Sequence, residues 1–310
     1  MILTDDRLSQ LPGEACLSVV MPCFNEEETV LQVTEAVLAS PYTREVIAVD
    51  DGSTDRTLEA LRAVSDPRMV VLEQRVNQGK GAALRRGFAR AEGPLVIVQD
   101  ADLEYDPGEY GTVLAPLLEG KADVVYGSRF HTAKPHRVLY FWHSVGNKFL
   151  TMASNMSTNL NLTDMETCYK AFRREVLDSF EIQEDRFGFE AEVTAKVAGG
   201  DWRIYEVGVS YSGRTYSQGK KIGWRDGFKA LYCIVRYSPV WASRAGRRQT
   251  DGFAGQRLPD ASADGRPAGP TGGGELTAGA AGQGIGLTGN GAPDRHPSDR
   301  HPAPRGTRRD

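Results

Sequence analysis

Cysteine is scarce in this sequence, and its spacing forms no metal-binding or disulfide pattern. The 310 residues contain four cysteines, Cys16, Cys23, Cys168 and Cys233, with no Cys-x-x-Cys pair. Zinc sites and disulfide-stabilised small domains need paired or closely spaced cysteines. We therefore expect buried free thiols and a reducing compartment.

Long apolar runs and an excess of one charge are also missing. No run reaches the roughly eighteen residues that suggest a membrane-spanning helix, and residues 1–15 lack the basic and apolar segments of a secretory leader. The chain has 37 Lys and Arg against 41 Asp and Glu, so it has no positive field to attract a phosphate backbone. These absences predict a cytoplasmic protein that neither spans a membrane nor binds nucleic acid.

The C-terminal part of the chain has few large apolar residues. Residues 251–310 contain 14 Gly and 7 Pro, and such a segment cannot bury enough surface to offset the entropy of ordering it. We predict a disordered tail over 244–310, which we interpret as a solvated linker rather than a lipid-binding segment. The folded domain is expected over 16–243, after an N-terminal extension over 1–15.

Short β-branched runs alternate with amphipathic segments between residues 16 and 130. The runs show no polar alternation, which is typical of strands covered on both faces of a parallel sheet. The expected strands are 17–21, 45–50, 69–74, 95–100 and 123–127, and the expected helices are 29–38, 57–64 and 81–91. This pattern predicts an α/β domain with a doubly wound, mostly parallel sheet, whose chemistry lies just after each strand.

Polar residues follow the first two expected strands. After the first, Pro22 fixes a turn, and Asn25 or Glu26 is placed to cap the next helix. After the second, Asp50 and Asp51 precede a Ser-Thr-Asp run that can itself cap a helix. Because one cap suffices, we expect the two carboxylates to accept hydrogen bonds from a nucleobase or a ribose.

A lysine between two glycines follows the third expected strand. Gly79, Lys80 and Gly81 open a helix, and the N–H groups of a helix start can hold a phosphate. The P-loop pattern is absent. Two interpretations stay open, a phosphate site and a plain left-handed turn.

Three acidic residues follow the fourth expected strand. Asp100, Asp102 and Glu104 are spaced two apart, and such close like charges repel one another unless a cation lies among them. Oxygen ligands without a nearby His or Cys favour Mg²⁺ or Mn²⁺. We expect these three residues to bind one of these metals, and a solvated acidic loop is the alternative.

Together these motifs resemble family 2 glycosyltransferases with the glycosyltransferase A-type fold. PCFNEEE at 22–28, VDDGSTD at 49–55, NQGKG at 77–81 and DADLE at 100–104 occur in the order and spacing of that family. YGSRF at 126–130 and the segments 163–176, 186–197 and 203–221 also resemble enzymes related to dolichol-phosphate mannose and glucose synthases. The resemblance covers about residues 16–240.

The resemblance implies a nucleotide-sugar donor, with 16–130 as the donor half and 131–243 as the acceptor half. The motifs and the resemblance together give the nucleotide-sugar site as Pro22, Phe24, Asn25, Glu26, Asp50, Asp51, Lys80, Asp100 and Ala101. They give Asp100, Asp102 and Arg129 as the catalytic residues, with the metal on Asp100, Asp102 and Glu104.

The resemblance also implies a polyprenyl-phosphate acceptor, whose phosphate would face Arg129. Such a phosphate is ionised at pH 7, so it needs positioning and charge screening rather than a general base. The other basic residues expected near it are Arg137, Arg214, Lys220 and Lys221. The chain differs from the mannose synthases at Glu190, where they have a lysine, and in a basic segment reduced to Lys134, His136 and Arg137. These differences leave the donor sugar open.

Two segments combine large apolar side chains with basic ones. They are 138–156 and 223–241, and their composition is typical of helices that lie in a membrane surface. Core packing is the alternative. Surface contact, or a separate membrane-anchoring protein, would bring this chain to a polyprenyl acceptor.

The sequence therefore predicts a metal-dependent inverting glycosyltransferase. It would move a sugar from a nucleotide donor to a polyprenyl phosphate, as a peripheral protein at the cytoplasmic face of the membrane. One alternative is transfer to a soluble or polysaccharide hydroxyl, with Glu190 or Glu192 as the catalytic carboxylate. Another is a nucleotide-sugar-binding protein without catalysis.

Overall fold

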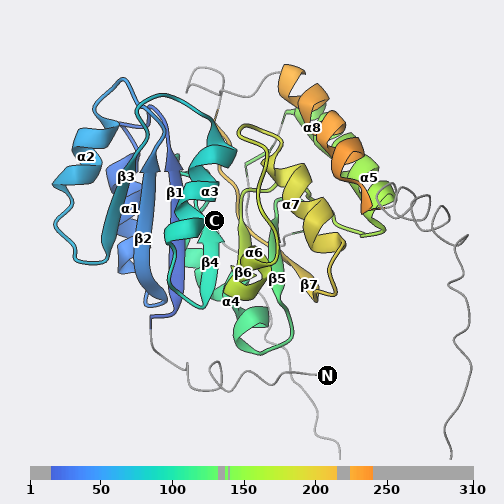
Figure 1. Ribbon diagram of the computed structural model, residues 1–310, viewed down its shortest axis with the longest axis horizontal. Helices are drawn as coiled ribbons and strands as arrows, with labels where there is room; N and C mark the ends of the chain where they lie inside the picture. Colours follow the sequence, from blue (N-terminus) through green and yellow to red (C-terminus); the bar gives the residue numbers. More distant parts are fainter. Residues whose placement is uncertain (1–14, 132–136, 139, 215–223, 240–310) are drawn as a thin grey trace, which may run out of the picture. The chain divides into compact units, whose positions relative to one another are not determined.

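The computed structural model describes residues 15–131, 137–138, 140–214 and 224–239. The predicted tail and nearly all of the predicted N-terminal extension lie outside these residues. The described part forms a seven-stranded sheet in the order β3-β2-β1-β4-β6-β5-β7 (Figure 1). The strands are β1 (Leu17–Cys23), β2 (Thr43–Asp50), β3 (Met69–Glu73), β4 (Leu95–Val98), β5 (Val124–Ser128), β6 (Lys170–Arg173) and β7 (Ile204–Gly208).

Helices cover both faces of the sheet because successive side chains of each strand point to opposite faces. In β1, Val19 and Met21 join a hydrophobic cluster with α1, α2 and α4, whereas Val20 joins a second cluster with α3, α6 and α7. The helices are α1 (Val30–Ala39), α2 (Thr57–Ala63), α3 (Lys80–Arg90), η1 (Pro107–Glu109), α4 (Tyr110–Leu118), α5 (Phe141–Thr158), α6 (Arg174–Asp178), α7 (Phe189–Ala198) and α8 (Trp224–Tyr237). A strand that lies between two layers of helices has apolar side chains on both faces. This explains why the apolar runs in the sequence show no polar alternation.

The predicted α/β domain with a mostly parallel sheet is confirmed. Each strand and helix expected between residues 16 and 130 is present within two residues of its predicted ends. Two strands were not expected: β7 is parallel to β5, and β6 is antiparallel to both of its neighbours, β4 and β5. Because β6 comes from the predicted acceptor half, the two predicted halves share one sheet.

The helix cap predicted at Asn25 or Glu26 is wrong. Helix α1 has Thr29 at its N-cap, without a side-chain cap hydrogen bond. Asn25 instead has a positive φ of 53°, and its Oδ1 accepts a hydrogen bond from the N–H of Thr54 at 2.8 Å. Asn25 therefore ties the loop after β1 to the loop after β2.

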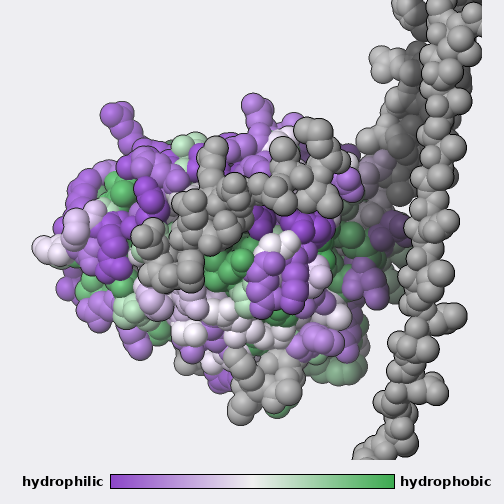
Figure 2. Space-filling view, turned by 90° about the horizontal axis from the view of Figure 1, so that it is seen from below, coloured by the Kyte–Doolittle hydropathy of each residue, from purple (hydrophilic) through white to green (hydrophobic). Residues whose placement is uncertain are grey.

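The carboxyl ends of β1 to β4 lie at one edge of the sheet, because these four strands are parallel. This edge is at the top of Figure 1, where the contacting helices α5 and α8 also lie. Figure 2 shows the lower face, on which hydrophilic residues predominate and hydrophobic ones form separate patches. Ligands of such sheets bind beyond the carboxyl ends of the strands, so we looked for the site at the upper edge.

Close packing explains the glycines at the start of α3. A Cβ on Gly81 would lie 2.0 Å from the carbonyl oxygen of Glu184, and one on Gly79 would lie 2.4 Å from that of Asp185. The N–H of Ala82 donates to the Asp185 carbonyl at 3.0 Å, so it is already used. Close packing therefore accounts for both glycines, and a phosphate site at this helix start stays a prediction.

This packing makes Gly81→Ala destabilising. The new Cβ would overlap the backbone of Glu184 and Asp185, and overpacking of this kind costs about 1–3 kcal/mol. Urea unfolding would measure the change in the free energy of unfolding. Gly146→Ala in α5 is the matched control, because a Cβ there meets nothing within 4 Å and the helix should gain about 0.5–1 kcal/mol. Equal stability of the Gly81 variant and the native protein would contradict the packing argument.

Candidate active site

A large pocket lies at the carboxyl ends of the parallel strands. Its volume is about 1320 Å³, and it extends from the strand ends to helices α5 and α8. The predicted site residues that line it are Pro22, Phe24, Glu26, Asp51, Lys80, Asp100, Ala101, Asp102, Glu104, Arg129 and Arg214. Asn25, Asp50 and Arg137 are not among its lining residues. The fold thus assembles most of the predicted site from segments distant in sequence.

Lys80 joins two acidic side chains within this pocket. Its Nζ lies 2.9 Å from Asp100 Oδ1 and 3.3 Å from Glu190 Oε1, and it also contacts the sulfur of Cys168. Burial lowers the pKa of Lys80, but the charges of Asp100, Cys168 and Glu190 outweigh this effect and raise it well above its usual range. Lys80 is therefore a permanent positive charge between β4 and α7.

The three carboxylates predicted to bind a metal line the same pocket, but Glu104 has other partners. Glu104 accepts hydrogen bonds from the Tyr211 hydroxyl and from the N–H of Arg214, both at 2.7 Å. Within the part of the chain that the structure describes, no group of three or more His, Cys, Asp and Glu is placed to hold a metal ion. Glu104 thus contacts the segment that follows β7, and the predicted set of three metal ligands stays a prediction.

Asp102 lies where its own negative charge is disfavoured. Burial, and then the charges of Asp100 and Glu104, raise the pKa of the Asp102 carboxyl to about 8. Arg214 acts in the opposite direction but does not offset these effects. The pocket thus holds more negative charge at this point than the protein neutralises, a condition that a cation relieves.

Arg214 lies at the donor end of the pocket rather than beside Arg129. Its Nη2 is 2.6 Å from Glu26 Oε2 and donates to the carbonyl oxygen of Asp102 at 3.1 Å. The prediction that Arg214 meets the acceptor phosphate is not supported by this position. Instead Arg214 connects the loops that follow β1 and β4.

The two carboxylates at the end of β2 have different surroundings. Asp51 accepts hydrogen bonds from the Gln74 side chain and from the N–H groups of Gln78 and Gly79, at 2.7 to 2.8 Å. Asp51 therefore fixes the loop before α3, and its predicted role toward a nucleotide stays a prediction. Asp50 keeps a buried Oδ1 that has no hydrogen-bond partner among the described residues.

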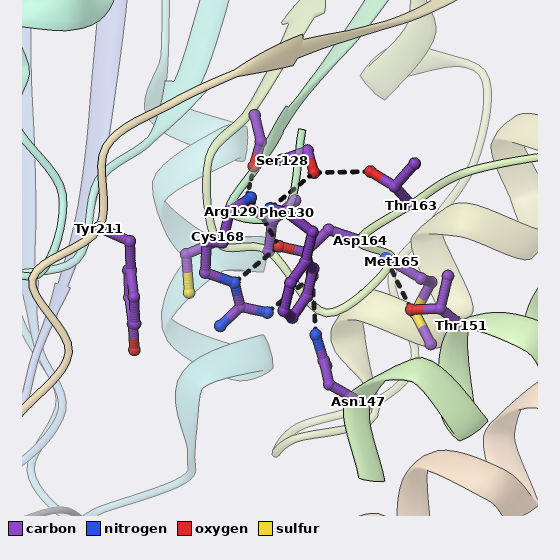
Figure 3. Close-up of polar contacts among 12 residues, drawn as sticks. Ser128, Arg129, Phe130, Asn147, Thr151, Thr163, Asp164, Met165, Cys168 and Tyr211 are labelled. Carbon is purple, nitrogen blue, oxygen red and sulfur yellow. Dashed lines mark hydrogen bonds and ion pairs between the residues drawn. The ribbon is translucent and has the colours of Figure 1, made fainter. Parts of the chain in front are cut away.

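Arg129 is held at the pocket by a bidentate ion pair (Figure 3). Its Nε and Nη2 lie 2.6 and 2.7 Å from the two carboxylate oxygens of Asp164. Asp164 also accepts a hydrogen bond from Asn147 of α5 at 3.0 Å. Burial raises the pKa of Asp164, but the charge and hydrogen bonds of Arg129 outweigh it and lower the pKa. The guanidinium is thus oriented at the pocket by two bonds to Asp164.

Arg137, another basic residue predicted for the acceptor, is not among the residues that line the pocket. Arg137 is exposed and donates to the carbonyl oxygen of Gly213 at 3.0 Å, so it supports a loop. The remaining ones, Lys134, His136, Lys220 and Lys221, lie outside the described residues.

Comparisons with known proteins decide the family. The model of glycosyl transferase family 2 matches residues 18–180. An uncharacterised glycosyltransferase of Mycobacterium tuberculosis is 34% identical over 214 residues, which is 69% of this chain and 92% of that protein. The chain belongs to glycosyltransferase family 2. The predicted membership, and with it the prediction of an enzyme, is confirmed.

A further relative of this family 2 glycosyltransferase is named for its acceptor. Undecaprenyl-phosphate 4-deoxy-4-formamido-L-arabinose transferase of Proteus mirabilis is 29% identical over 211 residues, which is 66% of this chain. The match spans 62% of that enzyme, so somewhat more than a third of its length has no counterpart in the match.

Solved structures show the fold of this glycosyltransferase. Glucosyl-3-phosphoglycerate synthase of Mycobacterium tuberculosis, in complex with Mn²⁺, UDP and phosphoglyceric acid, gives a TM-score of 0.57 at 21% identity, over 72% of this chain and 78% of the other. Mannosyl-3-phosphoglycerate synthase of Rubrobacter xylanophilus gives 0.55 at 19% identity, over 83% and 84%. The predicted glycosyltransferase A-type fold is confirmed.

Three residues of the glycosyltransferase site were not predicted from the sequence. Glu166 and Cys168 line the pocket, and Asp164 binds Arg129. All three lie in the segment just before β6, more than thirty residues after Arg129, so no local spacing links them to it. The sequence does contain a signal, which is a run of polar residues next to a buried strand. Here the run precedes the strand, whereas at the other strand ends it follows.

Helices α5 and α8 of the glycosyltransferase expose an apolar surface. Its residues are Phe141, Trp142, Val145, Phe149, Met152 and Met156 on α5, and Phe228, Tyr232 and Val235 on α8. Trp142 and Met156 are 78% and 77% exposed, and α5 contains one Lys but no Asp or Glu. Contiguous apolar surface of this kind marks an interaction site. Across the described ranges, no helix has the length and apolar character needed to cross a membrane.

Proposed function

We propose that this glycosyltransferase is a metal-dependent, inverting enzyme that transfers a sugar from a nucleotide donor to a polyprenyl phosphate. We also propose that it works as a peripheral protein at the cytoplasmic face of the membrane. The name of the Proteus mirabilis relative, an undecaprenyl-phosphate transferase, supports the choice of acceptor.

The continuity of the pocket carries this proposal. Asp100 and Asp102 line one end, Phe141 and Phe228 line the other, and Arg129 lines the same space. A nucleotide sugar is polar throughout, whereas a polyprenyl phosphate is a single anionic group on a long apolar chain. A pocket with a carboxylate-rich end, a fixed arginine and an apolar end suits these two substrates together.

A divalent metal fits at Asp102. The crowding of negative charge there is the observation that favours a cation, and Asp100 is the second residue that would hold it. Mg²⁺ and Mn²⁺ sites of this kind take few protein ligands and complete their coordination with substrate phosphates and water. When bound, the metal neutralises the charge that develops on the departing diphosphate.

A phosphate acceptor needs no chemical activation by the side chains of the protein. The phosphate is already ionised, so Arg129 needs only to bind it and orient one oxygen toward the anomeric carbon. Attack from the side opposite the leaving diphosphate inverts the configuration at that carbon. No general base is needed.

A hydroxyl acceptor remains the alternative, and Glu190 is the residue that favours it. Glu190 lines the pocket, where a general base would have to be. The other candidate, Glu192, accepts hydrogen bonds from the N–H groups of Gln183 and Glu184 at 2.7 Å, so its carboxylate is used to hold a loop. The alternative therefore depends on Glu190 alone.

The apolar surface of α5 and α8 supports the membrane part of the proposal. A polyprenyl chain is found only in a bilayer, so the open apolar end of the pocket has to reach one. Lys148 is the single Lys or Arg on α5 and no acidic residue opposes it, which favours anionic lipid headgroups.

One assay tests acceptor and membrane together. Purified protein is incubated with Mg²⁺ or Mn²⁺, a labelled nucleotide sugar, and anionic liposomes with or without polyprenyl phosphate. We expect label in the organic phase only with the lipid phosphate, in a product that mild acid hydrolyses. Met156→Glu on α5 should lower the liposome-bound fraction at least about threefold, whereas Leu31→Glu, an exposed apolar position on α1, should not.

Two outcomes would contradict the proposal. An aqueous, acid-stable product would indicate a hydroxyl acceptor. Equal liposome binding by both variants and the native protein would show that α5 does not contact the bilayer.

A further inference from the structure

Glu190 lines the pocket and has a buried carboxylate oxygen that no described residue binds. The residue is 4% exposed and lines the pocket. Its Oε1 is paired with Lys80 at 3.3 Å, but its Oε2 has no hydrogen-bond partner among the residues that the structure describes. A buried acceptor without a donor costs free energy, so this oxygen is a strong candidate for contact with a ligand.

Glu166 has the same property. It lines the pocket, and its buried Oε1 also lacks a hydrogen-bond partner in the described ranges. Burial, and then the charge of Glu190, raise the pKa of Glu166 to about 7, so the two carboxylates are close enough to affect each other. They offer two unused acceptor atoms within one region of the pocket.

The backbone on both sides of Glu166 is fixed. The Nζ of Lys170 is fully buried and donates to the carbonyl oxygens of Met165 and Thr167, the residues that flank Glu166. The hydroxyl of Thr167 also donates to the carbonyl oxygen of Gly127 at 2.5 Å. Glu166 is therefore held in a preorganised position, as expected of a binding residue rather than a flexible surface group.

The position of the two residues identifies the part of the substrate they meet. Glu190 and Asp100 bind the same ammonium group of Lys80, so Glu190 lies about two hydrogen-bond lengths from the diphosphate end of the pocket. Glu166 lies within the electrostatic influence of Arg129, the proposed acceptor end. Between leaving diphosphate and acceptor phosphate lies the sugar that is transferred.

We propose that Glu166 and Glu190 hold the transferred sugar by accepting hydrogen bonds from its hydroxyl groups, and that they select neutral hexoses against sugar acids. This inference rests on the proposed function of the same site. Hydroxyl groups are the donors that a neutral sugar supplies, and a carboxylate accepts such hydrogen bonds strongly. A uronic acid would bring a third negative charge next to these two, and such like-charge contacts exclude wrong ligands.

The test compares nucleotide binding with sugar recognition. Wild type is first assayed with UDP-glucose, UDP-galactose, UDP-N-acetylglucosamine and GDP-mannose to find the donor it uses. Glu166→Gln and Glu190→Gln are then compared with Glu181→Gln, an exposed glutamate before α7. We expect both pocket variants to lose about ten- to hundredfold in kcat/KM for the donor, with the affinity for the free nucleoside diphosphate changed less than about twofold. Retained nucleotide binding also shows that the variants are folded.

The second part of the test measures how strongly the pocket discriminates against a negatively charged sugar. Each protein is assayed with the uronic acid form of the same nucleotide sugar, for example UDP-glucuronate where UDP-glucose is the donor. Wild type should discriminate against it, and each Gln variant should relax that discrimination by about tenfold, because one negative charge is gone. The Glu181 variant should behave as wild type.

The outcomes separate this inference from the proposed function. If wild type glycosylates polyprenyl phosphate but both pocket variants keep native kcat/KM and native discrimination, the inference alone is overturned. If transfer goes only to a hydroxyl acceptor and Glu190→Gln abolishes kcat with an unchanged KM for the donor, Glu190 is a general base. That result overturns both.

Discussion

Asp102→Asn is expected to lower turnover at saturating acceptor by about a hundredfold or more. The variant keeps the size of the side chain but removes a negative charge from the place where we propose a divalent cation. Without that cation the diphosphate leaves with its charge uncompensated, and a single such electrostatic contact is worth about this factor. Initial rates with labelled donor, measured across a Mg²⁺ and Mn²⁺ titration, give the size of the loss and show whether more metal restores activity.

Asp106→Asn is the matched control for this change. Asp106 lies four residues further on and caps η1 by accepting a hydrogen bond from the N–H of Gly108 at 2.8 Å, a role that asparagine also fills. It should keep native activity. Near-native turnover of the Asp102 variant, or full activity of the native protein in excess chelator, would rule out the metal.

The second large effect is expected at Arg129. Arg129→Ala would leave the Asp164 carboxylate buried and unpaired, which costs about 3–5 kcal/mol in itself. We therefore use the double variant Arg129→Met with Asp164→Asn, which removes both charges. It should transfer sugar to polyprenyl phosphate at least about a hundredfold more slowly, while the affinity for a nucleoside diphosphate stays within about twofold.

Arg129→Lys separates charge from geometry at the same position. Lysine keeps a positive charge beside Asp164 but loses the planar fork that binds carboxylate and phosphate together. Its KM for polyprenyl phosphate should rise about tenfold with little change in the KM for the donor. Native transfer rates in the double variant would show that Arg129 only stabilises the loop before β6.

The first half of the fold could be predicted because the local sequence of each strand is enough to identify it. The run from Val46 to Val49 is apolar at every position and buried on both faces, so it reads as a central strand without knowledge of its neighbours. The sequence of strand β6 gives no such signal, because the strand begins at Lys170 and ends at Arg173, and both residues are charged. Both are buried, because Lys170 binds backbone carbonyls and Arg173 pairs with Asp123. Only the completed fold supplies those partners.

The candidate site, like the fold, could be predicted only in part. Asp100 and Lys80 follow strand ends, and the topology of parallel strands brings such positions together. The residues that contact these side chains, and so determine their roles, lie far away in the sequence. Arg214 reaches Glu26 across 188 residues, and no sequence spacing encodes that contact. The hydrogen bonds that Asp51 accepts from Gln74, Gln78 and Gly79 were likewise not predictable from its place after a strand.

The antiparallel strand β6 also bears on how the chain acquires its structure. Since β6 lies between β4 and β5, a nascent chain that ends before Lys170 has a bare edge on β4, and β5 has no strand to join it to the rest. Exposed edges of this kind pair with other chains and promote aggregation. The nucleotide-binding segment therefore cannot mature as a separate unit during synthesis. Strand β4 is paired by residues made about seventy positions after it, and β5 by residues made about forty positions after it. The central sheet therefore forms late and has a high contact order.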